Sequence, residues 1–254
     1  MLGTSPAVSE AAPGVMRLHL CRPARGNALT SADLALMSGH LDAIEADVST
    51  NVLIVSAAGR FFCTGFDFAS LAAELESKAA VGAFERFADR LARTRVVTIA
   101  ALNGPAMGGG TDVALACDLR IGTADASMAM PAARFGLPLY AGAIARYVAS
   151  FGVDRAKRMI LGGRKHEASE LQTLGILAEL VRPEDLEAQV VAWASEIAGL
   201  PASAMAAMKA AINSAAVGRG VGDEAEGAIH RVVTADAEAI LARIAHIRSA
   251  ARAR

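Results

Sequence analysis

Two short apolar runs, each followed by a glycine-containing turn and then by a helical pattern, constrain the fold of this chain most strongly. The runs are residues 52–55 and 96–102. A short, continuous apolar run indicates a strand buried on both faces, as in a parallel sheet covered by helices. The turns that follow are residues 59–68, which include Gly65, and 103–110, which end in three consecutive glycines. This repeated order predicts an α/β fold.

Strand and helix patterns alternate in the first half of the chain, and helical patterns dominate the second. Apolar residues at helical spacing predict a helix over 31–47, which Ser31 can cap, and another over 68–93. Further strands are expected at 16–20, 119–121, 127–130 and 176–181, and further helices at 111–116, 141–151, 153–161, 167–174, 184–198, 202–217 and 221–248. The helical tail carries apolar stripes, and another subunit is expected to cover part of them.

Length and charge limit the functions open to the chain. Its 254 residues suit one large domain, and a hydrophobic content of 54% supports a sizeable core. The net charge of −1 provides no basic surface for nucleic acid, and the aromatic content of 4% provides few rings for base stacking. We therefore expect no nucleic-acid partner.

Cysteine usage and the first residues indicate where the protein works. Cys21, Cys63 and Cys117 form no CxxC pair, so neither a metal site nor a redox motif is predicted. An odd cysteine count without a secretory signal is typical of the cytoplasm. Residues 1–14 are small and polar with two prolines, which predicts a flexible N-terminus and not a signal peptide. Charges, glycines or prolines interrupt every long apolar stretch, so no membrane-spanning segment is expected.

Both glycine turns would lie at the carboxyl ends of strands, where open α/β sheets bind ligands. Glycine lets a ligand approach the backbone, and N–H groups at a helix start lack partners and attract negative charge. Two such N–H groups meeting at one oxygen form an oxyanion hole. The triple glycine lacks the lysine of a P-loop, and neither turn matches a dinucleotide-binding fingerprint. Glycines that merely permit tight turns are the alternative interpretation.

At these residues the chain resembles the crotonase superfamily, also called the enoyl-CoA hydratase/isomerase family. The resemblance is carried, in order, by Arg-Pro-Ala-Arg-Gly-Asn-Ala-Leu at 22–29, Phe-Cys-Thr-Gly-Phe-Asp at 62–67, Asn-Gly-Pro-Ala-Met-Gly-Gly-Gly at 103–110, Ala-Cys-Asp-Leu-Arg at 116–120, and residues 168–181. It implies a crotonase-like ββα spiral over 15–195. It also implies a helical C-terminal region over 196–254 that supports a homotrimer or a dimer of trimers.

The same resemblance implies a substrate and a site. The substrate is an acyl-CoA thioester, so coenzyme A is part of the substrate and no separate cofactor or metal is expected. The N–H groups of Phe66 and Gly109 take the family's oxyanion-donor positions and would stabilise a thioester enolate. The acyl-CoA contacts would fall on Arg25, Ala28, Thr64, Asp67 and Phe68.

The acid–base residues depart from the family pattern. The family's hydratases use two glutamates, and their positions here hold Asp112 and Ala132, so the two-glutamate mechanism does not carry over. A dienoyl-CoA isomerase branch shares the aspartate at this position. That branch also needs carboxylates at the positions of Ala132 and Tyr140, and this chain has neither. Ala132 is still expected to lie beside the substrate. Asp112 can act as a base or position a water, or it can simply stabilise a helix start. Tyr140 can donate a proton to an enolate, or be a buried tyrosine with a satisfied hydroxyl.

Other polar or reactive residues near these motifs receive structural interpretations. Asp67 is expected to fix turn geometry, Asp118 to anchor a strand end, and Cys63 to fill a small core position. Met128 and Met130 are expected to line an acyl pocket or the core. The function expected is hydration or double-bond isomerisation of an enoyl-CoA. The alternatives are a non-catalytic acyl-CoA-binding protein, or thioester hydrolysis or decarboxylation on the same fold.

Overall fold

The structure, a computed structural model, describes residues 5–71 and 82–216. The chain divides into two compact units, Met1–Leu200 and Pro201–Arg254. The first unit contains both sheets, and the second contains helix α8 (Ala202–Ala216). The helix expected at 221–248 lies outside the described residues, as do residues 72–81 of the helix expected at 68–93.

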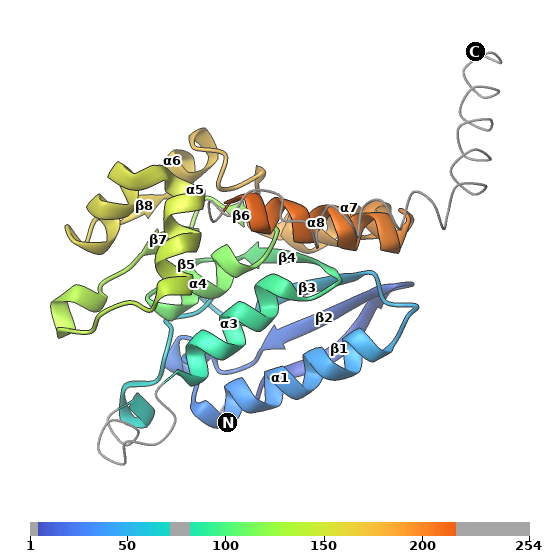
Figure 1. The fold of residues 1–254 in the computed structure, drawn as a ribbon, viewed down its shortest axis with the longest axis horizontal. Coiled ribbons are helices and arrows are strands. Elements are labelled where there is room, and N and C mark those ends of the chain that lie inside the picture. The colour runs from blue at the N-terminus through green and yellow to red at the C-terminus, as the bar shows by residue number, and fades with distance from the viewer. Residues whose placement is uncertain (1–4, 72–81, 217–254) are drawn as a thin grey trace. The chain divides into compact units, whose positions relative to one another are not determined.

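Six strands form the main sheet in the order β1-β2-β3-β4-β6-β9 (Figure 1). Every neighbouring pair is parallel except β1 and β2, which are antiparallel. The strands are β1 (Ala7–Ala12), β2 (Val15–Leu20), β3 (Val52–Ala57), β4 (Val97–Leu102), β6 (Leu119–Thr123) and β9 (Glu179–Val181). The predicted α/β class, with a mainly parallel sheet, is confirmed.

Strand β1 corrects the expectation of a flexible segment over 1–14 for residues 7–12 of that segment. Residues 7–12 pair with β2 through a turn at Gly14, whose φ of 74° suits glycine. None of the β1 residues is buried, because β1 is an edge strand of the main sheet. A strand without a buried face can consist of small and polar residues, so its sequence shows no apolar alternation.

Short segments form a second layer beside the main sheet. Strands β5 (Pro105–Met107), β7 (Ser127–Ala129) and β8 (His166–Glu167) make a small sheet in that order. An isolated bridge extends the layer by joining Cys63 to Ala106. Successive segments therefore give one strand to the main sheet, one short segment to the second layer and then a helix, which is the ββα spiral that the resemblance implies.

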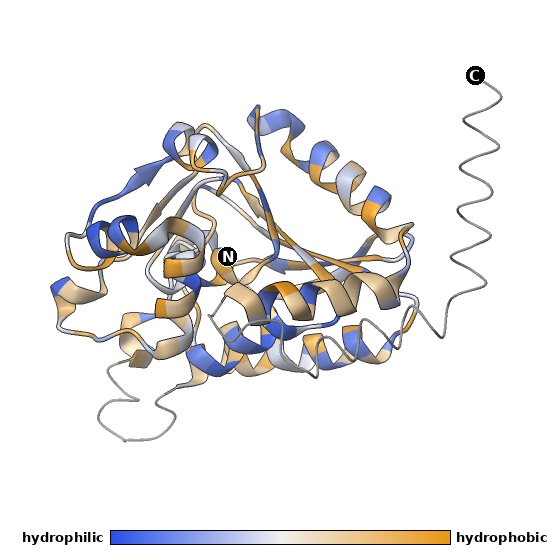
Figure 2. Ribbon diagram, turned by 45° about the horizontal axis from the view of Figure 1, so that its top comes forward, coloured by the Kyte–Doolittle hydropathy of each residue, from blue (hydrophilic) through white to orange (hydrophobic). Residues whose placement is uncertain are grey.

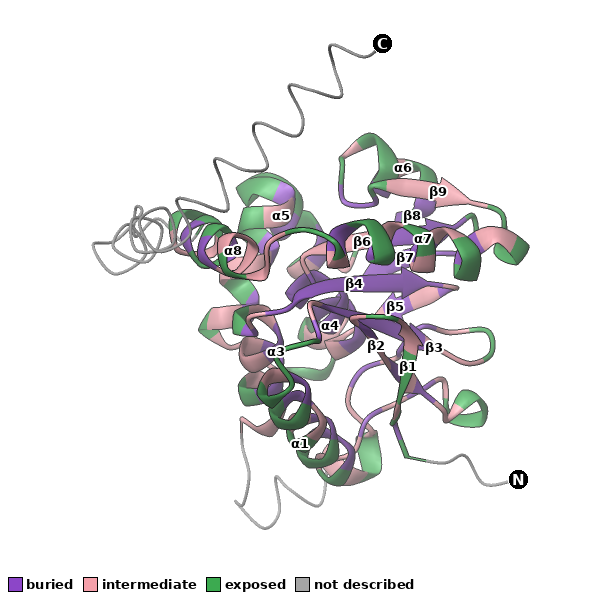
Figure 3. Ribbon diagram, turned by 90° about the vertical axis from the view of Figure 1, so that its right-hand side faces the viewer, coloured by how far each residue is buried: buried purple, intermediate pink, exposed green. Residues whose placement is uncertain are grey.

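Helices cover both faces of the main sheet. Helices α1, α3, α4 and α5 pack in succession along one side, and α7 packs against β2, β3, β4 and β6 on the other (Figures 1 and 3). Between them, all six positions of β4 are buried, which accounts for the continuous apolar run in its sequence. These helices and α6 are α1 (Ser31–Ala46), α3 (Ala83–Arg93), α4 (Gly109–Ala116), α5 (Ala141–Ile160), α6 (Ala168–Thr173) and α7 (Leu186–Ala198).

Two helix details bear on the predicted boundaries. Thr30, and not Ser31, is the N-cap of α1, because Thr30 and Asp33 form a reciprocal capping box. Helix α5 spans the two segments expected at 141–151 and 153–161. Its backbone is non-helical at Gly152, the residue that separates those two predicted segments.

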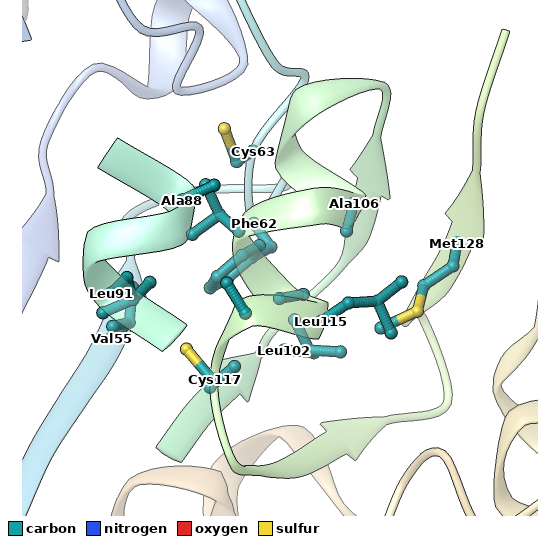
Figure 4. Packing of buried hydrophobic residues seen from close by; sticks show 14 of the residues in the cluster. Val55, Phe62, Cys63, Ala88, Leu91, Leu102, Ala106, Leu115, Cys117 and Met128 are labelled. Carbon is teal, nitrogen blue, oxygen red and sulfur yellow. The ribbon is translucent and has the colours of Figure 1, made fainter. Parts of the chain in front are cut away.

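The hydrophobic core lies between the main sheet and the helices α1, α3, α4 and α5. The central strands carry mainly hydrophobic residues, while the helices carry both hydrophobic and hydrophilic ones (Figure 2). Phe62, Leu102, Leu115 and Met128 meet in this core (Figure 4), which gives Met128 a packing role. Burying side chains of this size contributes about 1.5–3 kcal/mol each. The core therefore holds the turns at 59–68 and 103–110 in place, because Phe62 lies in the first turn and Leu102 directly precedes the second.

A membrane-spanning helix is not found among residues 5–71 and 82–216. Helices α7 and α8 meet the criteria of length and apolarity only when the two are counted together.

Candidate functional site

The two glycine turns contact each other at the carboxyl ends of β3 and β4. A short ladder joins them: Met107 donates its N–H to the Cys63 carbonyl at 2.9 Å, and Cys63 donates to Pro105 at 3.4 Å. Gly65 packs directly on the start of helix α4, where a Cβ would lie only 2.7 Å from the Gly109 nitrogen. With a φ of 94°, Gly65 also needs a backbone conformation that other residues rarely adopt.

Close packing explains two more glycines of the second turn. A Cβ on Gly110 would lie 2.0 Å from the carbonyl oxygen of Cys63, and one on Gly104 would lie 1.9 Å from that of Arg60. No side chain fits at either position without moving the backbone. Close approach of two chain segments, and not the tight turns of the alternative interpretation, therefore accounts for glycine at these two positions.

The N–H groups of Phe66 and Gly109 lie beside this contact. Leu29 bonds to both neighbours of Phe66, accepting from Asp67 and donating to Gly65, each at 2.8 Å. In such a parallel bridge, the N–H of the middle residue faces away from the partner strand. Gly109 is the first residue of α4, so its N–H has no acceptor within the helix. Within the described parts of the chain, neither N–H donates a hydrogen bond to another residue.

Phe84 of helix α3 is a neighbour that no sequence motif marks. Its ring lies edge-on to the ring of Phe66, with 6.1 Å between the centroids. It also covers Gly109, because a Cβ there would come within 2.4 Å of the Phe84 Cζ atom. An apolar ring thus touches both residues that the sequence nominates as oxyanion donors.

The expected acyl-CoA contacts from the first motif lie against the first glycine turn. Thr64 donates its N–H to the Gly26 carbonyl at 3.0 Å, and the two residues pack so closely that a Cβ on Gly26 would overlap the Thr64 side chain. Arg25 and Ala28 flank this contact, and Arg25 is exposed. The structure therefore brings Arg25, Ala28 and Thr64 into one neighbourhood.

Asp67 and Phe68 continue the same turn. The Asp67 carboxylate accepts the N–H groups of Ala69 and Ser70, each at 3.1 Å, which confirms its interpretation as a turn residue. The exposed ring of Phe68 lies 5.0 Å from that of Phe135, measured between centroids. Phe135 ends the 3-10 helix η2 that begins at Ala132, so Ala132 belongs to a segment that contacts this turn.

Asp112 and Tyr140 meet in a cluster of charges that the sequence did not reveal. Tyr140 donates its hydroxyl to the Asp112 carboxylate, which is almost fully buried. Arg146 of α5 holds the same carboxylate with two donors, Nε at 2.8 Å and Nη2 at 3.0 Å. Its Nη1 atom donates to Asp89 of α3 at 2.6 Å. The cluster of Asp89, Asp112, Tyr140 and Arg146 thus joins helices α3, α4 and α5.

The cluster changes the proton affinities of its members. Burial raises the pKa of Tyr140, and the adjacent negative charge of Asp112 raises it further. Burial by itself lowers the pKa of Arg146, but hydrogen bonds to Asp112 and Asp89 outweigh it and raise the pKa above its usual value. Arg146 therefore remains charged, and Tyr140 remains protonated, at neutral pH.

Arg146 and Asp89 had no signal in the sequence. Arg146 lies 34 positions from Asp112 and 57 positions from Asp89, so no local spacing links them. Asp112 does lie in the first turn of α4, as the helix-start interpretation requires. Its bidentate pairing with Arg146 is an additional role that neither interpretation of Asp112 included.

Two residues near the site have the structural roles expected of them. Burial raises the pKa of the Cys63 thiol to about 12, so the reactive thiolate is not formed at neutral pH. The Asp118 carboxylate accepts the N–H of Thr98 at 2.8 Å and its hydroxyl at 2.9 Å, and so anchors β4 beside β6. Among residues 5–71 and 82–216, no three His, Cys, Asp or Glu side chains gather as metal ligands do.

Known proteins that are similar to this chain belong to one family. A family model described as enoyl-CoA hydratase/isomerase matches residues 10–227. The probable enoyl-CoA hydratase echA6 of Mycobacterium leprae is 31% identical over 205 residues, which is 80% of each chain. The 2,3-dehydroadipyl-CoA hydratase of Escherichia coli is 32% identical over 172 residues, covering 68% of this chain and 67% of that protein.

Solved structures share the fold. The crystal structure of an enoyl-CoA hydratase from Bacillus anthracis has a TM-score of 0.79 at 28% identity, covering 90% of this chain and 92% of that one. A probable enoyl-CoA hydratase/isomerase from Mycobacterium abscessus has a TM-score of 0.78 at 25% identity, with coverage of 94% and 91%. The spiral built from two strand layers and covering helices is therefore the arrangement found in these proteins.

Proposed function

This chain belongs to the enoyl-CoA hydratase/isomerase family, and on that premise we propose that it converts an enoyl-CoA through a thioester enolate held by the N–H groups of Phe66 and Gly109. The observation that carries the proposal is the direct contact of Gly65 with the Gly109 nitrogen, beside two N–H groups without partners among the described residues. This contact supports the proposal that donors from two separate turns act on one oxygen.

The chemistry of a thioester suits such a pair of donors. Sulfur delocalises little charge into the carbonyl, so the α-protons are comparatively acidic, but the enolate still concentrates negative charge on oxygen. Fixed N–H donors offset that cost, and one donor is typically worth about 3–4 kcal/mol. The start of α4 adds the favourable field of a helix N-terminus.

Asp112 and Tyr140 are the groups we assign to proton transfer. Of the two positions where the family's hydratases have glutamates, Asp112 keeps a carboxylate and Ala132 has none, so the Tyr140 phenol is the second proton-transfer group that we assign. Isomerisation moves a proton between two carbons and needs a single shuttle, whereas hydration must also activate a water. We therefore favour double-bond isomerisation over hydration.

Substrate contacts follow the neighbourhood around the first glycine turn. The exposed Arg25 is suited to the phosphates of coenzyme A, because a guanidinium pairs well with phosphate oxygens. Ala28, Thr64, Asp67, Phe68 and Ala132 complete the proposed acyl-CoA surface, and no separate cofactor is needed. The assembled protein is proposed to be a homotrimer or a dimer of trimers, which light scattering of the full chain would measure.

Removal of one N–H tests the oxyanion role. Gly109→Pro deletes the donor at the first helical position, which tolerates proline, but ring atoms there would strike Phe84. We therefore compare Gly109→Pro with Gly109→Ala, both in a Phe84→Ala background that opens the space. Only the proline variant lacks the N–H, so its kcat on a panel of enoyl-CoA thioesters should be about 10²–10³-fold lower. Equal turnover of the two variants would refute the oxyanion role.

Product masses separate the proposed reaction from its alternatives. Isomerisation leaves the mass of the thioester unchanged, hydration adds a water, decarboxylation removes carbon dioxide, and hydrolysis releases free coenzyme A. One alternative has a specific observation in its favour: Arg146 occupies both oxygens of Asp112, as expected if the protein binds acyl-CoA without converting it. Calorimetric binding of the thioesters without turnover of any of them would establish that alternative.

A further inference from the structure

We propose that Arg146 is a positioning residue, which fixes Asp112 and Tyr140 in the orientation that the reaction uses. The inference rests on the proposed function, since it assigns Arg146 to the proton-transfer groups of that reaction. Its basis is a network of hydrogen bonds: Arg146 bonds both oxygens of Asp112 and one of Asp89, while Tyr140 bonds Asp112.

The shape of the guanidinium explains why arginine stands at this position. Nε and Nη2 point in parallel and match the two oxygens of Asp112, at 2.8 and 3.0 Å. Nη1 remains free for Asp89 at 2.6 Å. A lysine ammonium is a point charge and cannot hold one carboxylate with two parallel bonds while reaching a second.

Gly142 is a second, independent sign that the chain is built around this cluster. It lies in the first turn of α5, where a Cβ would come within 2.4 Å of the Asp89 carboxylate. Any side chain there would push Asp89 away from Arg146. The sequence thus leaves room for Asp89 at the helix that carries Arg146.

The contacts define what Arg146 does for the reaction. Two parallel bonds leave Asp112 one side-chain orientation, and that orientation places its Oδ2 atom at the Tyr140 hydroxyl. Arg146 Nη2 also lies 3.5 Å from that hydroxyl oxygen. Arg146 has no contact with Phe66 or Gly109 in the structure. Its loss should therefore reduce kcat, which depends on proton transfer, and leave KM unchanged.

The test compares Arg146→Ala and Arg146→Lys with the wild type on the enoyl-CoA that it converts best. We expect kcat to fall about 10²-fold in both variants, as for a misplaced catalytic group, with KM unchanged. Methylguanidinium added to Arg146→Ala should restore part of the lost kcat, whereas the methylammonium ion should not. Arg155→Ala is the matched control, because Arg155 is an exposed arginine of the same helix.

A further variant separates positioning from simple support of the fold. Gly142→Ala displaces Asp89 but leaves the two bonds between Arg146 and Asp112 in place. Its kcat should fall less than that of Arg146→Lys. If Arg146→Ala does not fold, as judged by circular dichroism, Arg146→Lys decides the question, because it keeps the buried positive charge.

The outcomes distinguish this inference from the proposed function. An active wild type whose kcat is unchanged by Arg146→Lys overturns the positioning role alone. A fall in kcat without rescue of Arg146→Ala by methylguanidinium, in a protein that remains folded, also overturns it. A wild type that converts no enoyl-CoA overturns the proposed function, and the positioning role with it.

Discussion

The two parts of the candidate site are built from different chemical groups, backbone amides in one and side chains in the other. The glycine-turn region, residues 59–68 and 103–110, presents backbone N–H groups and is held by backbone hydrogen bonds and close glycine contacts. The charge cluster of Asp89, Asp112, Tyr140 and Arg146 consists of side chains from three helices. The first region depends on where side chains are absent, and the second on four particular side chains being present.

This difference determines how each region fails. An added methyl group in the glycine-turn region forces the backbone to move, whatever its chemistry. Removal of one charged side chain from the charge cluster leaves the packing almost intact, but the charge of its partner then stays buried without a counter-ion. The largest losses of stability are therefore expected where a buried charge loses its partner.

Arg146→Ala should have the largest effect on stability. It leaves Asp112, with 2% of its side chain exposed, and the partly buried Asp89 without their shared cation. Breaking a buried ion pair in this way typically costs about 3–5 kcal/mol. Urea unfolding followed by circular dichroism would measure the free energy of unfolding, with Arg155→Ala as the exposed control. A loss no greater than that of Arg155→Ala would contradict the prediction.

Gly110→Ala should come next and tests the glycine-turn region. Its Cβ would lie 2.0 Å from the Cys63 carbonyl oxygen, so the two turns must separate, at a cost of about 3 kcal/mol. Gly39→Ala is the matched control, because Gly39 is exposed in α1 with nothing within 4 Å of the added carbon. That control should stabilise the protein by about 0.5–1 kcal/mol. Equal melting temperatures for the two variants would show that the turns are not in contact.

Tyr140→Phe should have a smaller effect, since Asp112 keeps its two bonds to Arg146. The loss of one hydrogen bond to a charged group costs about 1.5 kcal/mol. Tyr147→Phe provides the control: its buried hydroxyl lies beside Thr111 and hydrogen-bonds no charged group among the described residues, so its removal should cost less than removal of the Tyr140 hydroxyl. A Tyr147→Phe variant as unstable as Tyr140→Phe would show that the phenol of Tyr140 gains nothing from Asp112.

The contrast also explains what could be predicted from the sequence. The strands at 52–57 and 97–102 were predictable because both faces are buried: Leu53 faces the core under α1 and α3, while Ile54 is buried outside that cluster. The glycine turns were predictable because they follow these strands directly. Backbone chemistry is local, so a local motif can reveal it.

What escaped prediction depends on contacts between distant residues or on short, partly exposed segments. Arg146 and Phe84 each reach the site from a helix without a recognisable motif, and their partners are far away in the sequence. Strand β1 escaped because an edge strand needs no apolar face. The cap of α1 was misplaced by one residue, at Ser31, because Thr30 and Ser31 are both good caps and only the Asp33 contacts choose between them.

The N-cap of α1 gives the smallest predicted effect on stability. It also links the two kinds of contact, those made by side chains and those made by the backbone. Thr30 precedes α1 and directly follows Leu29, which forms backbone hydrogen bonds with Gly65 and Asp67 of the first glycine turn. The side-chain cap at Thr30 therefore stabilises the backbone next to those hydrogen bonds. The Thr30 hydroxyl donates to the Asp33 carboxylate at 2.8 Å, and its oxygen accepts the Asp33 N–H at 3.2 Å. Thr30→Ala should cost about 1 kcal/mol at neutral pH.

The cost of Thr30→Ala should also depend on pH. Burial raises the pKa of Asp33, but hydrogen bonds from Thr30 and Arg22 outweigh burial and hold the pKa below its ordinary value of 3.8. A lowered pKa means that Asp33 stabilises the fold above that ordinary value and loses this contribution as the pH falls through the lower folded-state value. The stability gap between the wild type and Thr30→Ala should therefore narrow in acid, as urea midpoints at about pH 7 and about pH 3 would show. A gap of the same size at both pH values would mean that the Asp33 carboxylate takes no part in the cap.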